Sequence, residues 1–432
     1  MAPTLARSSL INLGSRLLAV ALGLALTLYT ARLGPQAQGV FALFLAVEAV
    51  LLALGSGFGV AMARQLSHHQ QHPGALVRAS VVVCVALGCC LALALWGVSR
   101  LGERAASSYG SLAWLALMAP LMLLPGNLSG LWLGRGHMLG LSAFMLAPPA
   151  LTLLGIGLAG VLGGVASVTT VLAAWVAARL VVALFSLGAT VRGGWLQPAG
   201  AAGQPGGVVE PLRPHARFIV VIGLTNLVSL LNYKVDLFLV ERFLGLSATG
   251  IYSIAVAVAE LLWLISSAVT TAAYARIGQP DRDAAVALTI QAMRMSVLLL
   301  LALCPLLWLA AALLVPWLLG EAYAPALPVL ALLLPGVALY GAASALSAWF
   351  TNHAGRPQVP ALLALGSLLL NIGVSVWAIP RWGMAGGAVA TSVSYGVTMV
   401  VAAVWFVRAA GIPWRRLWQP TRALPAGGQR GA

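Results

Sequence analysis

Charged residues are scarce in this sequence. They make up 8% of its 432 residues, whereas soluble domains carry roughly 25%, and the mean hydropathy is +0.98. A chain with so little charge cannot cover a globular surface with polar groups, which excludes a soluble globular protein. The apolar runs are long and unbroken, unlike the short alternating segments of a β-barrel. We therefore predict an all-α integral membrane protein, because lipid forces every backbone polar group to bond within the protein.

Acidic residues and cysteines are also few. Nine carboxylates are present, and no two of them lie close together in an expected external loop, so we predict no catalytic centre and no enzyme activity. The four cysteines (Cys84, Cys89, Cys90 and Cys304) lie in apolar runs without metal-ligand spacing. The stretch "HHQQH" (68–72) has no carboxylate or cysteine nearby and is typical of a solvated loop. We expect no bound metal and no cofactor.

Long apolar runs dominate what remains. A membrane-spanning helix needs about 20 apolar residues, and twelve runs meet this requirement. They cover residues 9–33, 38–62, 77–99, 111–133, 139–162, 167–190, 216–240, 247–273, 286–315, 326–350, 358–380 and 384–408. The first run is longer than the roughly 7–15-residue core of a signal peptide, so we expect it to remain as a span.

A Gly- and Pro-rich stretch, residues 191–215, follows the sixth run and has the composition of a flexible linker. We therefore predict two six-helix lobes, residues 1–190 and 216–408, joined by this cytoplasmic linker and followed by a polar cytoplasmic tail, residues 409–432. The arginines mostly fall on the side that holds both termini. Because positively charged loops stay in the cytoplasm, we predict cytoplasmic termini in a multi-pass protein of the bacterial inner (plasma) membrane. The net charge of +15 is spread along the chain without a nucleic-acid motif, so we expect no nucleic-acid partner.

An internal repeat supports this division. "LGPQAQGVF" (33–41), between the first two spans, matches "LGLSATGIY" (244–252), between spans seven and eight. Two weaker matches follow in the same order: "GRGHMLGLSAF" (134–144) with "GRPQVPALLAL" (355–365), and "GVASVTTVLA" (164–173) with "GMAGGAVATS" (383–392). Two six-span units inserted the same way round are related by a pseudo-two-fold axis along the membrane normal, an architecture typical of transporters.

Two segments carry a family resemblance. "RLGPQAQGVFAL" (32–43) and "LNYKVDLFLVERFLGLSATGIYSIAVAVAELL" (231–262) resemble the Wzx-type O-antigen and exopolysaccharide flippases, members of the multidrug/oligosaccharidyl-lipid/polysaccharide exporter (MOP) superfamily. Span count, loop lengths and repeat order agree over nearly the whole chain. The resemblance implies two lobes in a V around a central cavity. It also implies an undecaprenyl-diphosphate-linked oligosaccharide as substrate, moved from the cytoplasmic to the periplasmic leaflet during surface polysaccharide or lipopolysaccharide biosynthesis.

Three cations lie inside the expected spans, where an ionisable side chain is costly and suggests a function. On the family resemblance, we predict that Arg16, Arg179 and Lys234 line the cavity and bind the substrate's diphosphate. The planar guanidinium of arginine matches phosphate oxygens well. Arg16 and Lys234 could instead extend to lipid headgroups, and Arg179, in the middle of its span, could face a water-filled cavity or pair with an acid.

Three acids share the spans. Asp236 follows Lys234 by two positions, about 200° around the helix, so the two side chains cannot pair directly. Glu48 and Glu260 occupy near-equivalent positions of the repeat. We interpret Glu48, Asp236 and Glu260 as ion-coupling or charge-balancing residues. Glu260 could carry a proton or a sodium ion, or pair with Arg179 or Lys234, while Asp236 could lock a contact between helices.

These predictions favour a flippase for lipid-linked oligosaccharide that works by alternating access among membrane lipids. The alternative is a drug or small-molecule antiporter of the same superfamily, coupled to H+ or Na+, which predicts fewer cavity arginines and a paired acidic ion site in one lobe. An integral membrane polymerase or ligase would need a large periplasmic loop, which the short external connections exclude. A major-facilitator carrier would show a Gly/Asp/Arg-rich motif where this chain reads "RQLSHHQQHPG" (64–74).

Overall fold

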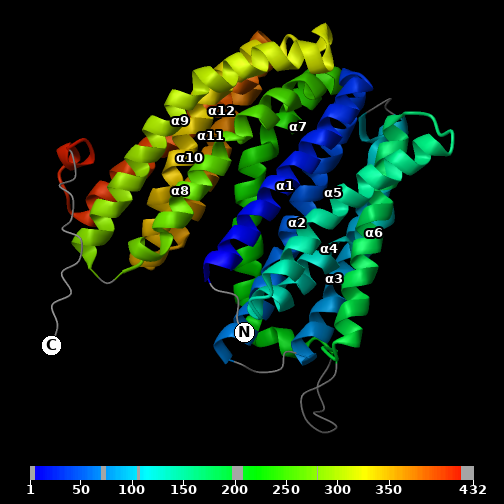
Figure 1. Cartoon of the computed structure of the whole chain (residues 1–432), viewed down its shortest axis with the longest axis horizontal. Coiled ribbons are helices and arrows are strands. Elements are labelled where there is room, and N and C mark those ends of the chain that lie inside the picture. Colours follow the sequence, from blue (N-terminus) through cyan, green and yellow to red (C-terminus); the bar gives the residue numbers. More distant parts are fainter. Residues whose placement is uncertain (1–4, 70–73, 105–107, 197–207, 280, 420–432) are drawn as a thin grey trace. The chain divides into compact units, whose positions relative to one another are not determined.

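Every regular element in the described part of the chain is helical. The computed structural model describes residues 5–69, 74–104, 108–196, 208–279 and 281–419. Twelve long helices follow one another (Figure 1): α1 (Leu5–Arg32), α2 (Pro35–His69), α3 (Gly74–Arg104), α4 (Leu112–Gly134), α5 (Met138–Val161), α6 (Val168–Arg192), α7 (Ala216–Glu260), α8 (Leu262–Ile277), α9 (Arg282–Leu319), α10 (Ala326–Ala348), α11 (Gln358–Trp382) and α12 (Met384–Ala410). Parts of the "HHQQH" stretch, of the predicted linker and of the tail lie outside the described residues.

The helices are long and apolar enough to cross a membrane in eleven continuous segments of the described chain. One segment, Glu210–Thr271, contains 62 residues and would be about 93 Å long as a straight helix, three times the roughly 30 Å hydrocarbon core. Gly245 interrupts it with φ 80° and ψ −179°, a conformation that suits glycine because it has no Cβ. This break turns the segment into two spans, so the predicted twelve-helix membrane fold is confirmed.

In the first six helices, α4 packs against α2, α3 and α6, and α5 packs against α6 and α1. Glycines allow the closest approach. A Cβ atom added to Gly130 of α4 would lie 2.1 Å from the carbonyl oxygen of Gly59 in α2. The "GSGFGVA" run of α2 therefore serves backbone contact between helices, as small residues do in membrane proteins.

The last six helices repeat this pattern. The central helix is α10, which packs against α8, α9 and α12, while α11 packs against α12. If each helix is matched with the one six places later, the partners of α4 become the partners of α10. The internal repeat detected in the sequence is thus present in the helix packing of each unit.

Turn glycines refine the register of the repeat. Gly34 and Gly245, aligned by the first sequence match, have φ angles of 108° and 80°. The second match paired Gly134 with Gly355, but the turn glycine with positive φ before α5 is Gly136, at 68°, against 62° at Gly355. That match is therefore shifted by two residues, because a turn needs its glycine at the left-handed position and tolerates other residues nearby.

By packing, the chain divides into two compact units, Met1–Leu230 and Leu231–Ala432. This division falls inside α7, because the first turns of α7 pack on α2. A Cβ atom on Gly57 would lie 2.1 Å from the carbonyl oxygen of Ile219. The amide nitrogen of Asn226 also donates a hydrogen bond of 2.8 Å to Oγ of Ser56. The two units are called below the N-terminal unit and the C-terminal unit.

Candidate functional site

An ion pair joins α2 and α6 in the N-terminal unit. Nε of Arg179 lies 2.7 Å from Oε1 of Glu48, and Nε1 of Trp175 donates a hydrogen bond of 2.9 Å to Oε2 of the same carboxylate. The side chain of Glu48 is 3% exposed and that of Arg179 is 23% exposed. Trp175 precedes Arg179 by four residues on α6, so the two share a helix face, and the guanidinium carbon lies 5.0 Å from an indole ring centre. A buried carboxylate is thus balanced by one cation and one neutral donor.

A cavity of about 580 Å³ lies beside this pair. Its wall includes Arg16 from α1 and Arg179 from α6, together with small and apolar residues of α2, α4 and α5. The ion pair with Glu48 is made through Nε of Arg179, and a guanidinium has five N–H donors. The other N–H groups can therefore still serve an acceptor in the cavity. The position of Arg16, exposed on α1, adds a second guanidinium to the same wall.

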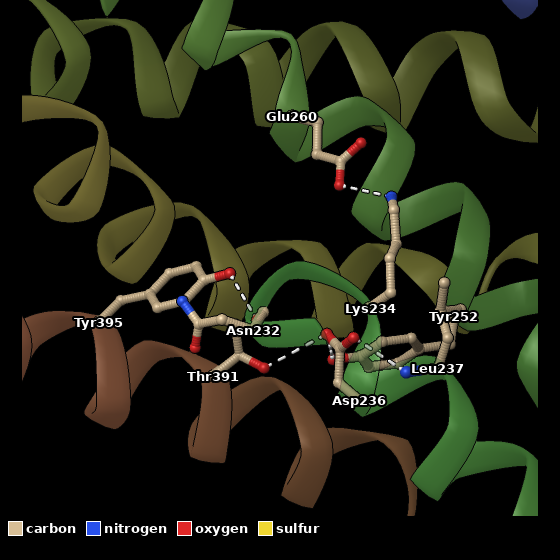
Figure 2. Close-up of polar contacts among 8 residues, drawn as sticks. All are labelled: Asn232, Lys234, Asp236, Leu237, Tyr252, Glu260, Thr391 and Tyr395. Atoms are coloured by element: carbon tan, nitrogen blue, oxygen red, sulfur yellow. Dashed lines mark hydrogen bonds and ion pairs between the residues drawn. The ribbon is translucent and has the colours of Figure 1, made fainter. Parts of the chain in front are cut away.

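The second ion pair lies in the C-terminal unit. Nζ of Lys234 is 2.8 Å from Oε1 of Glu260, and the two side chains are 23% and 30% exposed. The break at Gly245 reverses the chain and brings residues 26 positions apart into contact. Figure 2 shows Lys234 extended toward Glu260, while Asp236 is turned toward other partners. The prediction that Lys234 and Asp236 face different ways is confirmed, and of the partners left open for Glu260 the structure selects Lys234.

Asp236 sits in a hydroxyl-rich setting and is 3% exposed. Its carboxylate accepts hydrogen bonds from the hydroxyl groups of Tyr252, at 2.9 Å, and Thr391, at 3.3 Å, and from the backbone nitrogen of Leu237, at 2.9 Å (Figure 2). Behind Thr391, the side-chain amide of Asn371 donates to its hydroxyl oxygen at 3.3 Å. Three helices, α7, α11 and α12, therefore meet around one buried carboxylate.

The structure thus brings together two of the three predicted cations, Arg16 and Arg179, on one cavity. It places Lys234 in the other unit with an acidic partner. Sequence reasoning missed Trp175 and Tyr252. Both had a signal: Trp175 lies one helical turn before an in-span arginine, and Tyr252 is the aromatic residue that ends the repeated turn motif. Phe41 ends the first copy of that motif, as Tyr252 ends the second, and its ring packs edge-on against Trp175 with ring centres 5.9 Å apart.

Comparison with known proteins gives a family match for part of the chain and a fold for nearly all of it. Residues 153–328 match the family model described as "Polysaccharide biosynthesis protein". No curated protein sequence matches the chain.

Solved structures match over almost the full length. A multidrug resistance MATE family transporter of the MOP superfamily in its inward-facing conformation is 16% identical, with a TM-score of 0.74 over 91% of this chain and 94% of that one. Its outward-facing conformation is 17% identical, with a TM-score of 0.68 over 94% and 96%. A MOP superfamily transporter from Pyrococcus furiosus is 16% identical, with a TM-score of 0.63 over 94% and 93%.

At these identities the structural matches establish the fold alone, a multi-pass helical membrane fold shared with these solved transporters. The family model adds a link to polysaccharide biosynthesis over the centre of the chain. Both findings agree with the relationship that the sequence predicts: residues 153–328 match a polysaccharide biosynthesis family model, and the fold is similar to that of solved MOP superfamily transporters.

Proposed function

We propose that this protein is a flippase for an undecaprenyl-diphosphate-linked oligosaccharide, which it moves from the cytoplasmic to the periplasmic leaflet of the bacterial inner membrane. One observation carries the proposal: Arg16 and Arg179, from two different helices, line a single cavity of about 580 Å³. Two guanidinium groups on one wall suit a diphosphate, because each can donate paired hydrogen bonds to its oxygens. The match to a polysaccharide biosynthesis family supports the sugar part of the substrate.

The cavity is suited to loading from the cytoplasm. With both termini cytoplasmic, Arg16 lies in the cytoplasmic half of α1, and the other lining residues include Ser129 and Leu133 near the cytoplasmic end of α4 and Met138 at the start of α5. The diphosphate would occupy this cavity while the prenyl chain stays in lipid. Alternating access would then expose the head to the periplasm.

The acids have different roles in this proposal. Glu48 and Glu260 balance Arg179 and Lys234, with which they form ion pairs. Lys234 supplies positive potential when its pair with Glu260 opens. Asp236, held by hydroxyl and backbone donors, is the residue we assign to coupling with H+ or Na+.

The second candidate function is an ion-coupled drug or small-molecule antiporter. The hydroxyl-ringed carboxylate of Asp236 favours it, as does the fold shared with a transporter described as multidrug resistance. Such a transporter predicts fewer cavity arginines, so the presence of Arg16 and Arg179 on one cavity wall argues against it. Drug sensitivity of a deletion strain, with normal surface polysaccharide, would favour this candidate.

The test is made in cells that lack the gene. We expect lipid-linked oligosaccharide to accumulate facing the cytoplasm and surface polysaccharide to be lost. Wild-type protein should restore both, whereas a variant with Arg16→Ala, Arg179→Ala and Lys234→Ala should not. Gly23→Ala is a matched control, because a Cβ atom there meets open space. Normal polysaccharide from the triple variant, produced at wild-type level, would refute the proposal.

A further inference from the structure

A separate cavity of about 520 Å³ lies wholly within the C-terminal unit. It is formed by α8, α10, α11 and α12, with Tyr233 of α7 at one end. Among the described residues that line it, none carries a charge. Its volume falls within the range of about 300–1,000 Å³ that is usual for small-molecule sites. The ion pairs and the Arg16–Arg179 cavity described above do not account for it.

Two stripes of hydroxyl groups face this cavity. On α8 they are Ser266, Ser267, Thr270, Thr271 and Tyr274; on α10 and the turn after it they are Tyr340, Ser344, Ser347 and Thr351. The second stripe has spacings of four, three and four, which keep its members on one helix face. The stripes meet at Ser344, whose hydroxyl lies 2.6 Å from that of Thr270 and 3.2 Å from that of Ser266. Each hydroxyl can both donate and accept, so these contacts leave capacity for a ligand.

Aromatic rings close one end of the cavity. The rings of Tyr233 and Trp263 lie 4.8 Å apart, and Tyr340 meets Tyr233 edge-on at 5.9 Å. From Trp263 to Tyr274 the α8 wall extends for eleven residues, about 16 Å along the helix axis. The cavity is therefore an elongated slot, long enough for more than one pyranose ring.

The chemistry of the slot selects a class of ligand. Hydroxyl groups that are withdrawn from water need hydrogen-bond partners, so a ligand that displaces water from this slot must itself carry many hydroxyl groups. Flat aromatic surfaces favour an occupant that also has apolar faces. The absence of charge among the described lining residues disfavours anions and cations. A neutral saccharide has both hydroxyl edges and apolar C–H faces and carries no charge.

We infer that this slot is a binding subsite for neutral sugar residues of the transported oligosaccharide. The inference rests on the proposed function for its biological meaning, but the slot is separate from the arginine cavity. With cytoplasmic termini, Tyr274, Thr351 and Leu363 lie toward the cytoplasmic ends of their helices. The slot is thus placed to receive the sugar portion from the cytoplasmic side.

The test is saturation-transfer NMR on the full-length protein in nanodiscs, with maltotriose and cellotriose as neutral probes and tri-galacturonate as a charged comparison. We expect transfer to the neutral sugars and much weaker transfer to the uronate. Ser347→Ala with Thr351→Val removes two hydroxyls that each donate to a backbone carbonyl four residues earlier, so the fold should persist. Each loss should weaken neutral-sugar binding roughly two- to tenfold, and Ser347→Phe should block it.

Thr190→Val is the matched control, because Thr190 also donates to a carbonyl of its own helix, at 2.8 Å, but lies in the N-terminal unit. It should leave sugar binding unchanged.

Three results would overturn the inference: no transfer to either neutral sugar, equal transfer to the uronate, or binding that survives Ser347→Phe in folded protein. Arg16→Gln distinguishes it from the proposed function: loss of prenyl diphosphate binding with sugar binding intact supports both ideas. If prenyl diphosphate binds equally to wild type and Arg16→Gln while the sugar effects hold, the proposed function fails and the saccharide slot stands.

Discussion

The ion pair between Glu48 and Arg179 yields a quantitative prediction, because its two members differ in exposure. Changing Arg179 to Gln leaves the Glu48 carboxylate, 3% exposed, without its cation. Removing one partner of a buried ion pair lowers the free energy of unfolding by about 3–5 kcal/mol. Changing Glu48 to Gln instead leaves Arg179, which is 23% exposed and borders a cavity. Water can solvate the guanidinium there, so we expect the free energy of unfolding to fall by only about 1–3 kcal/mol.

The double variant, Glu48→Gln with Arg179→Gln, should be more stable than Arg179→Gln alone. Neither residue then carries a charge, and replacing a whole buried pair is often nearly neutral. We expect the free energy of unfolding of the double variant to lie within about 1 kcal/mol of the wild-type value, which gives a coupling energy of at least about 3 kcal/mol in the cycle. Surface polysaccharide should nevertheless remain absent, because the cavity has lost a guanidinium.

The assay uses Cys84, which is buried in the N-terminal unit. In a background with Cys89, Cys90 and Cys304 changed to Ala, a thiol-reactive dye reports when this unit opens during titration with SDS in mixed micelles. The reasoning about a coupled buried pair would be refuted if the two single variants lost equal free energies of unfolding and if these losses simply added in the double variant. A double variant that restores surface polysaccharide would show that Arg179 only balances Glu48.

Three further predictions concern single residues. Arg16→Gln should lower the rate of flipping in proteoliposomes. Because Arg16 is exposed, the free energy of unfolding should stay within about 0.5 kcal/mol of the wild-type value. An unchanged flipping rate would contradict the role of Arg16. Asp236→Asn keeps an oxygen that can accept from a hydroxyl, so the fold should survive while transport loses its dependence on a proton or sodium gradient; a gradient response equal to that of wild type would remove Asp236 from coupling. Gly57→Ala places a Cβ atom 2.1 Å from the carbonyl oxygen of Ile219 and should cost about 1–3 kcal/mol, measured by the same SDS titration, whereas Gly23→Ala should cost little.

Much of the fold could be predicted because membrane helices are determined by local properties. Run length and hydropathy give the spans, and the glycine of each repeated turn marks a reversal of the chain, as at Gly34 and Gly245. The division of the chain inside α7 could not be predicted. It depends on the fit between Gly57 and the backbone of Ile219, and sequence spacing contains no information on such a distant contact.

The sequence predicted which charged residues lie inside the spans, but not which of them form ion pairs. Helical spacing was enough to separate Lys234 from Asp236, since it depends on a single helix. The choice of Glu260 for Lys234, and of Glu48 for Arg179, depends on how helices pack. The hydroxyl stripes of α8 and α10 were visible at helical spacing, but membrane helices also use such residues to pack, so the cavity itself was needed to give them a function.

The central claim is that the Arg16–Arg179 cavity binds a prenyl-linked diphosphate. Its most direct test is the affinity of wild-type protein in nanodiscs for undecaprenyl diphosphate, compared with the stable variant that carries Arg16→Gln, Glu48→Gln and Arg179→Gln. The account predicts that wild type binds the diphosphate at least tenfold more tightly than this variant, and more tightly than it binds undecaprenol. Equal affinity of the two proteins for the diphosphate would contradict the account.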